Sequence, residues 1–200
     1  MKQKIELLIF GTLQSSIILI VFFLLFGLDI ASNTITMSDQ FNIFLICICT
    51  AFFEEIVFRY YLIRGLRRFF DKKKSVLISA VLFAACHLGN SHFTTTAFVS
   101  HFLGGIIYAY AYIHTKSIYY PVGLHFGWNY IQWLFSLPMS GTTKSGLYSL
   151  ILPTNDYWLG GNYGIEGGFA SLLIRSILFG VILFTVSRYE RNAHVRYGSK

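Results

Sequence analysis

Residues 41–63 have the sequence FNIFLICICTAFFEEIVFRYYLI, an apolar run that is interrupted in its second half by Glu54, Glu55 and Arg59. A helix needs roughly 20 mainly apolar residues to cross the hydrocarbon core of a bilayer, and this run is long enough. We therefore expect residues 41–63 to form a transmembrane helix. Its charged side chains need an explanation, because an ionisable group deep in a span costs about 3 kcal/mol.

Five further apolar stretches lie before and after this run, at roughly residues 5–28, 75–89, 93–115, 117–137 and 169–187. Of the 200 residues, 54% are hydrophobic and only 12% are charged, a balance that does not suit a soluble domain. We predict an all-α membrane bundle of about six transmembrane helices that forms a single transmembrane domain over residues 1–200. The first stretch is longer than the apolar core of a secretory signal peptide, so we interpret it as an uncleaved anchor.

The Lys and Arg residues are distributed unequally between the ends of these spans. Arg59 and Arg175 fall inside spans; with the N-terminus in the cytoplasm, all the others except Lys144 lie on the cytoplasmic side. The largest group occupies one loop and comprises Arg64, Arg67, Arg68, Lys72, Lys73 and Lys74. Because basic residues are enriched in cytoplasmic loops, we predict that both termini are cytoplasmic. The net charge of +7 then requires no nucleic-acid partner.

Polar side chains also interrupt the third and fifth stretches. His87 lies four residues after Phe83, and His125 and Asn129 are likewise four residues apart. At 1.5 Å per residue, these groups and residues 54–55 fall about 12 to 18 Å from the predicted cytoplasmic ends of their spans. We expect them to face one another in one layer, although each His taken singly has a simpler explanation as a hydrogen-bond partner between helices.

The two adjacent carboxylates are expected to have different environments. Glu55 and Arg59 share a helix face and can form an ion pair, whereas Glu54 is turned about 100° away. A buried ion pair between helices is the structural alternative for Glu55 and Arg59, but it leaves a second carboxylate unexplained. Glu54 is therefore the candidate for chemistry.

These residue types together suit hydrolysis of an amide by an activated water molecule. Glu54 can take a proton from the water, and His87 can hydrogen-bond the same water and carry its proton. His125 and Asn129 can donate hydrogen bonds to the oxyanion that develops on a scissile carbonyl.

Three motifs, Glu54-Glu55-x-x-x-Arg59, Phe83-x-x-x-His87 and His125-x-x-x-Asn129, resemble in this order those of the CPBP (Abi) family of CAAX-processing and bacteriocin-processing intramembrane proteases. The loop sequences at residues 117–124 and 160–168 are familiar in bacterial members. The resemblance covers a protease core of about residues 41–187. One departure is Tyr60, where many members have Gly.

The resemblance implies an intramembrane endopeptidase of the glutamic type. It assigns Glu54 and His87 to water activation and His125 with Asn129 to the oxyanion site. It makes Glu55 and Arg59 a supporting pair and Phe83 a packing element. It also implies a multi-pass protein of the bacterial plasma membrane, with a peptide or membrane-protein substrate favoured over a prenylated one. The oligomeric state is left open.

No cofactor is expected. Two His and a Glu are in principle a zinc-ligand set, but the chain has no His-Glu-x-x-His motif, and the resemblance favours a metal-free mechanism. The three cysteines, Cys47, Cys49 and Cys86, lie in apolar stretches and form neither a zinc nor a disulfide pattern.

Two other classes of function remain open: a non-catalytic membrane binding protein, such as a bacteriocin self-immunity factor, and a transporter that relays protons through buried Glu and His. Rhomboid-type and aspartyl proteases fit poorly, because the spans contain no matching Ser motif and no Asp pair. His101 is interpreted as a structural hydrogen-bonding residue. Glu166 and Asp156 are placed on the outer side, away from the site layer, and Arg175 is expected to snorkel or to pair internally.

Overall fold

Helices account for almost all regular structure in the computed structural model, which describes residues 1–26, 29–143, 145–150 and 157–197, with side chains up to Tyr189. Six helical rods coincide with the six apolar stretches, so the all-α bundle is confirmed. Their bounds are α1 (Lys2–Leu25), α2 (Met37–Glu55) continuing through the π-helix η1 (Ile56–Ile63) into α3 (Arg64–Leu66), α4 (Lys72–Ala85), α5 (Thr95–Thr115), α6 (Tyr119–Leu134) and α7 (Phe169–Tyr197).

Four of the rods are long and apolar enough to cross a membrane: Lys2–Leu25, Met37–Leu66, Thr95–Thr115 and Phe169–Tyr189. The other two are shorter, with 14 residues in α4 and 16 in α6. The short length of α6 suits its position, because its residues are almost all buried among α1, α2 and α5. A helix that is covered by protein does not need to match the thickness of the bilayer on its own.

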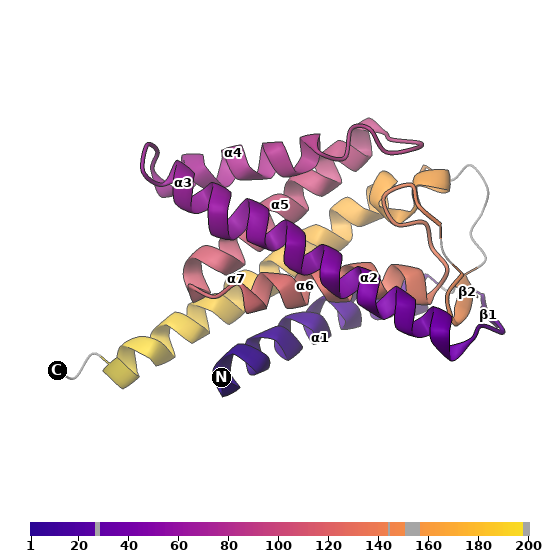
Figure 1. The fold of residues 1–200 in the computed structure, drawn as a ribbon, viewed down its shortest axis with the longest axis horizontal. Helices are drawn as coiled ribbons and strands as arrows, with labels where there is room; N and C mark the ends of the chain where they lie inside the picture. The colour runs from indigo at the N-terminus through magenta and orange to yellow at the C-terminus, as the bar shows by residue number, and fades with distance from the viewer. Residues whose placement is uncertain (27–28, 144, 151–156, 198–200) are drawn as a thin grey trace.

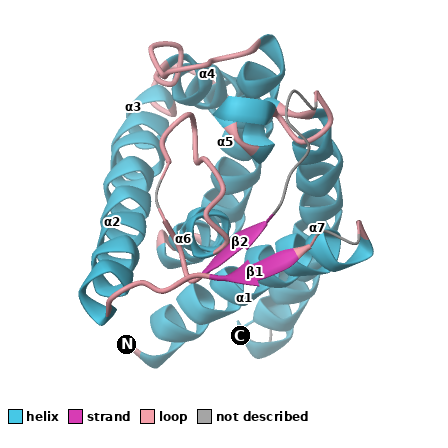
Figure 2. Ribbon diagram, turned by 90° about the vertical axis from the view of Figure 1, so that its right-hand side faces the viewer, coloured by secondary structure: helices cyan, strands magenta, loops and turns pink. Residues whose placement is uncertain are grey.

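Both termini and the loop between α3 and α4 lie at one end of the bundle (Figure 1). At the opposite end, β1 (Ile30–Ser32) pairs antiparallel with β2 (Tyr148–Leu150), in front of the helices in Figure 2. This arrangement agrees with an even number of spans, and the cytoplasmic assignment of the first end stays a prediction. Among the residues used in the sequence argument, Lys144, Asp156 and Lys200 lie outside the described residues, as do the side chains of Arg191 and Arg196.

Glycines on α6 allow an unusually close approach of α1. A Cβ atom at Gly123 would collide with the carbonyl oxygen of Leu8, and one at Gly127 would collide with the carbonyl oxygen of Thr12. Small residues four apart let two membrane helices pack backbone to backbone. Since His125 is two residues from each glycine, about 200° around the helix, it faces away from α1 and into the bundle.

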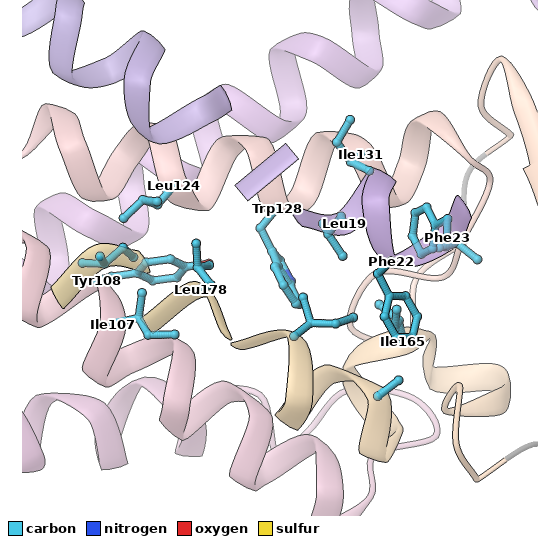
Figure 3. Packing of buried hydrophobic residues seen from close by; sticks show 14 of the residues in the cluster. Leu19, Phe22, Phe23, Ile107, Tyr108, Leu124, Trp128, Ile131, Ile165 and Leu178 are labelled. Atoms are coloured by element: carbon cyan, nitrogen blue, oxygen red, sulfur yellow. The ribbon is translucent and has the colours of Figure 1, made fainter. Parts of the chain in front are cut away.

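Apolar side chains from distant parts of the chain fill the centre of the bundle (Figure 3). Leu19 and Phe23 of α1 and Trp128 of α6 belong to this buried cluster, together with Tyr108 of α5 and Leu178 of α7. The cluster holds α6 at a defined height between the longer helices. The polar face of α6 is therefore presented to α2, α4 and α5.

Candidate active site

A cavity of about 480 Å³ opens between α2, α4, α5 and α6 and contains most of the polar side chains that the sequence singled out. Of the seven predicted site residues, five line it: Glu54, Phe83, His87, His125 and Asn129. Glu55 and Arg59 are fully buried behind its wall. The expectation that polar groups of three separate spans meet in one place is therefore correct.

The ion pair predicted from the spacing of Glu55 and Arg59 is present and extends to a third residue. Nε of Arg59 lies 2.9 Å from Oε2 of Glu55, and Nδ1 of His125 lies 3.0 Å from Oε1 of the same carboxylate. Both oxygens of Glu55 are thus engaged. A carboxylate held in this way orients the imidazole ring of His125 from behind.

Aromatic rings and a hydroxyl group complete the surroundings of Arg59. Its guanidinium carbon lies 4.8 Å from the centre of the Phe83 ring, and Nη1 lies 3.4 Å from Oγ of Ser79. The ring of Phe83 is also 6.0 Å from that of His125. Phe83 therefore occupies the space between the charged pair and the histidine, where it excludes water from the ion pair.

Glu54 is placed quite differently from its neighbour. Its side chain keeps 22% of its surface exposed, and Oε2 lies 3.8 Å from Nε2 of His125, beyond hydrogen-bond distance. No hydrogen-bond partner of Oε2 is found among the described residues. Glu54 thus lines the cavity with a partly exposed side chain, and its Oε2, which is itself buried, has no cation within hydrogen-bond distance in the described part of the chain.

A π-helical segment begins directly after these carboxylates, with η1 starting at Ile56. Such segments have wider turns than an α-helix and are frequent at functional sites. Arg59 lies within it and still reaches Glu55. Hydropathy does not distinguish a π-helix from an α-helix, so this feature was not predicted.

His87 lies just beyond the end of α4, and two contacts hold its ring. Nδ1 lies 2.8 Å from the carbonyl oxygen of Phe83, and the ring stacks on His101, with ring centroids 3.9 Å apart and an angle of 16° between the planes. A carbonyl group only accepts, so Nδ1 donates in this bond. In the neutral ring, Nε2 then carries the free lone pair.

The other predicted pair lies on α6. The ring of His125 stacks against Tyr108, with centroids 4.9 Å apart, while the nearly buried Asn129 lies one turn further along and lines the cavity. Their side chains approach the cavity from the side opposite the α1 contact. An amide and an imidazole in this position can both donate hydrogen bonds to an oxygen atom held in the cavity.

A second polar group of the cavity was missed in the sequence. Glu166 and Arg175, which also line the cavity, form a buried ion pair, with Oε1 of Glu166 2.9 Å from Nη2 of Arg175. The expectation that Glu166 lies away from the site is therefore wrong, whereas Arg175 does pair internally. The carboxylate also accepts hydrogen bonds from Nε1 of Trp128 at 2.8 Å and from Oγ of Ser140 at 2.7 Å.

The segment before α7 explains this error, because it folds back into the bundle instead of staying outside. Two short 3-10 helices, η2 (Gly161–Tyr163) and η3 (Ile165–Gly167), are joined at Gly164, whose φ is +89° and which packs against the carbonyl of Pro138. Depth counted along straight helices cannot represent such a return. Two features of the sequence could have indicated this return into the bundle: the glycines of residues 160–168 and the single Arg inside the last span.

The same segment also packs against the part of the cavity where His87 lies. Tyr163 of η2 places its hydroxyl 2.7 Å from Nε2 of His101, the ring on which His87 stacks. His101 is thus a hydrogen-bonding residue, as predicted, and it also contacts a predicted site residue.

The charge of Glu166 is stabilised by its partners. Burial opposes ionisation of the carboxyl, but the charge of Arg175 and the hydrogen bonds from Ser140 and Trp128 favour it, and the pKa of Glu166 is lowered to about 2. This carboxylate is therefore a fixed negative charge at neutral pH. It cannot exchange a proton during catalysis near pH 7.

The donor atoms do not form a metal-binding group in the part of the chain that the structure describes. Within that part, no three His, Cys, Asp or Glu side chains are arranged to hold a metal ion. Glu55 and His125 are already bound to each other. The metal-free mechanism stays a prediction that metal-chelation experiments can test.

A comparison with known protein families gives a match over residues 36–131 to the model described as type II CAAX prenyl endopeptidase Rce1-like. The matched segment runs from the start of α2 into α6 and contains all seven predicted site residues. It does not include Glu166 or Arg175. Comparisons with curated proteins and with solved structures give no match. The fold, the three motifs and this match lead to one identification: residues 36–131 belong to the Rce1-like family of type II CAAX prenyl endopeptidases, within the CPBP group.

Proposed function

We propose that the chain is an intramembrane endopeptidase that hydrolyses a peptide bond with a water molecule activated by Glu54. The observation that carries this proposal is the difference between two neighbouring carboxylates. Glu55 is fully buried, with one oxygen on Arg59 and the other on His125, whereas the side chain of Glu54 is partly exposed and its nearest charged neighbour among the described residues, Nε2 of His125, lies 3.8 Å from Oε2, beyond hydrogen-bond distance. A general base needs a lone pair that no cation already occupies, and of these two carboxylates Glu54 meets that need.

In the proposed reaction, Glu54 removes a proton from water while the oxygen of that water attacks the carbonyl carbon of the scissile bond. Nε2 of His87, the ring nitrogen that accepts, hydrogen-bonds the same water and directs it. The proton on Glu54 then passes to the leaving nitrogen as the C–N bond breaks. Atoms and charge balance without a cofactor.

The negative charge on the carbonyl oxygen is stabilised by His125 and Asn129. With Nδ1 of His125 donating to Glu55, Nε2 is the ring atom that can donate to the developing oxyanion when the ring is doubly protonated. Asn129 adds a donor from its amide. The fixed pair of Glu55 and Arg59 prevents the ring from turning away, which is the role of a positioning group.

The walls of the cavity support a substrate that comes from the bilayer. Ile46, Phe53 and Val57 on the α2–η1 rod line the cavity and are also exposed. An apolar segment of a peptide or membrane protein can contact these side chains while one of its carbonyl groups enters the polar interior. We propose such a substrate, and the plasma membrane of a bacterium as the location.

A cleavage assay with the full chain in liposomes tests this function. Transmembrane peptides of varied sequence are incorporated with wild-type protein, and products are identified by mass spectrometry. Glu54→Gln should abolish the products, while Glu6→Gln, the same change at an exposed residue of α1, should leave them unchanged. If Glu54→Gln retains the cleavage rate of the wild type, the chain is not a glutamic protease. Substrate capture without cleavage by the wild type would instead indicate a binding protein.

A further inference from the structure

A second hollow has a volume of about 570 Å³. The segments that line it lie at the end of the bundle where both termini are found, as the ribbon in Figure 1 shows. The hollow is formed by α3, the first residue of α4 and the last turn of α5. Five basic residues surround it: Arg64, Arg67, Arg68, Lys72 and Lys116. They come from positions up to about fifty residues apart in the chain, so the fold, and not a single run of sequence, gathers them around one space.

The positive charge around this hollow is not neutralised within the described residues. None of the five has a carboxylate within 4.0 Å in that part of the chain. Asp71 precedes Lys72 but is turned to Lys74, whose backbone N–H donates to Oδ1 at 2.8 Å. Several like charges facing one hollow repel each other, and a bound anion relieves that repulsion.

Lys116 has a backbone conformation that residues other than glycine adopt only at an energetic cost. It ends α5 with φ +54° and ψ 26°, in the left-handed region. Glycine adopts this conformation without steric cost, whereas a side chain costs roughly 1 kcal/mol or more. The side chain of Lys116 instead brings a cation to the rim of the hollow, and it also offsets the partial negative charge at the end of the α5 helix.

Apolar groups beside the basic ones favour a lipid as the source of the anion. Ile63 and Ile113 line the hollow. Phe69 is 82% exposed and Phe70 is 43% exposed, directly after Arg68 in the chain. Exposed aromatic side chains next to basic ones are typical of segments that lie in the headgroup region of a membrane.

We propose that this hollow binds the phosphate group of an anionic phospholipid at the predicted cytoplasmic surface. The ligand is a phosphate monoanion that carries an acyl-glycerol group. Guanidinium and ammonium groups bind the phosphate, and apolar side chains of the hollow contact the acyl-glycerol. The site is separate from the cavity of Glu54 and does not depend on the proposed protease activity.

Two lysine pairs provide a matched comparison. Lys72→Gln with Lys116→Gln removes two charges that line the hollow, and Lys73→Gln with Lys74→Gln removes two charges from the same end of the bundle that do not line it. The full chain in neutral detergent is titrated with dihexanoyl-phosphatidylglycerol, and the thermal unfolding midpoint reports binding. Dihexanoyl-phosphatidylcholine and sodium phosphate are titrated in separate experiments at the same concentrations.

The expected result is a rise of the midpoint with phosphatidylglycerol for the wild type and for the Lys73/Lys74 variant. The Lys72/Lys116 variant should need roughly thirty-fold more lipid for the same rise. Lys116→Gly should bind the lipid more weakly although its lipid-free midpoint does not fall, because glycine suits the left-handed backbone.

Three results would overturn the proposal. Equal loss of affinity in the two double variants would show diffuse attraction without a site. No loss in either would show that the lysines do not contact the lipid. An equal rise with sodium phosphate would show a site for free phosphate in place of a lipid.

Discussion

Nδ1 of His125 lies 3.0 Å from Oε1 of Glu55, on the side of the imidazole ring that faces away from the cavity of Glu54. This contact links α6 to α2 through a carboxylate that Arg59 already holds. Two consecutive glutamates therefore have different surroundings: Glu55 contacts Arg59 and His125, and Glu54 lines the cavity in which we propose that the substrate binds. This difference follows from the 100° turn between neighbouring residues of a helix.

Replacement of each glutamate by glutamine should distinguish the two residues. Glu54→Gln should lower the cleavage rate by about 10² to 10⁴, the usual contribution of a general base, with little change in stability. Glu55→Gln should lower stability as well, because Arg59 keeps a buried charge without its partner. Cleavage in liposomes and unfolding in mixed detergent micelles measure the two effects. Equal stability of both variants would contradict the assignment.

Removal of the arginine should destabilise the bundle strongly. Arg59→Met should lower the free energy of unfolding by about 3–5 kcal/mol, since Glu55 then keeps a buried charge with only His125 beside it. The double variant Glu55→Gln, Arg59→Met should be less destabilised than the sum of the single changes. Additive losses would show that the two residues do not interact.

The stack between His87 and His101 should affect turnover more than substrate binding. His101→Ala removes the ring on which His87 lies, and we expect kcat to fall roughly ten-fold with KM little changed, because a misplaced catalytic group is costly. His101→Phe keeps a ring and should recover most of that loss. A purely structural role would give the same kcat per folded molecule in both variants, and this outcome would exclude positioning of His87.

Acid should destabilise the protein through Glu166. The pKa of this carboxyl is about 2 in the folded chain, below its usual 4.5, so its ionised form stabilises the fold. That stabilisation, roughly 3 kcal/mol, is complete above about pH 5 and is lost as the pH falls toward 2. Unfolding midpoints between pH 7 and pH 3 should therefore fall more steeply for the wild type than for Glu166→Gln. Parallel curves would show that the ion pair with Arg175 adds no pH dependence.

The sequence predicts those parts of the site that depend on spacing within one helix or on hydropathy. The six rods follow from apolar stretches, and the contact between Glu55 and Arg59 follows from a separation of four residues. The sequence also predicts that polar groups of separate helices meet in one layer, but not which atoms of these helices contact each other. The bond from His125 to Glu55 is one example, because spacing along a chain does not give the rotation of one helix relative to another.

The loop before α7 shows a second feature that hydropathy does not predict. Its glycines permit backbone conformations that no hydropathy plot represents, and they bring Glu166 to Arg175 inside the bundle. The sequence marks such a segment as irregular and places it outside by default. Only the fold shows that its carboxylate lies in the wall of the cavity.

The backbone contact of α1 with Gly123 and Gly127 has a consequence for attempts to shorten the protein. The family match starts at residue 36, after α1, and stops before Arg175. A fragment trimmed to that match loses the helix that covers the glycines, and it also loses the buried pair of Glu166 and Arg175 that forms part of the cavity wall. The matched segment contains the residues of the proposed chemistry, but we expect it not to fold on its own, because it exposes the face of α6 that α1 covers. The packing of α1 against α6 thus fixes the position of the helix that carries His125 and Asn129 into the cavity lined by Glu54.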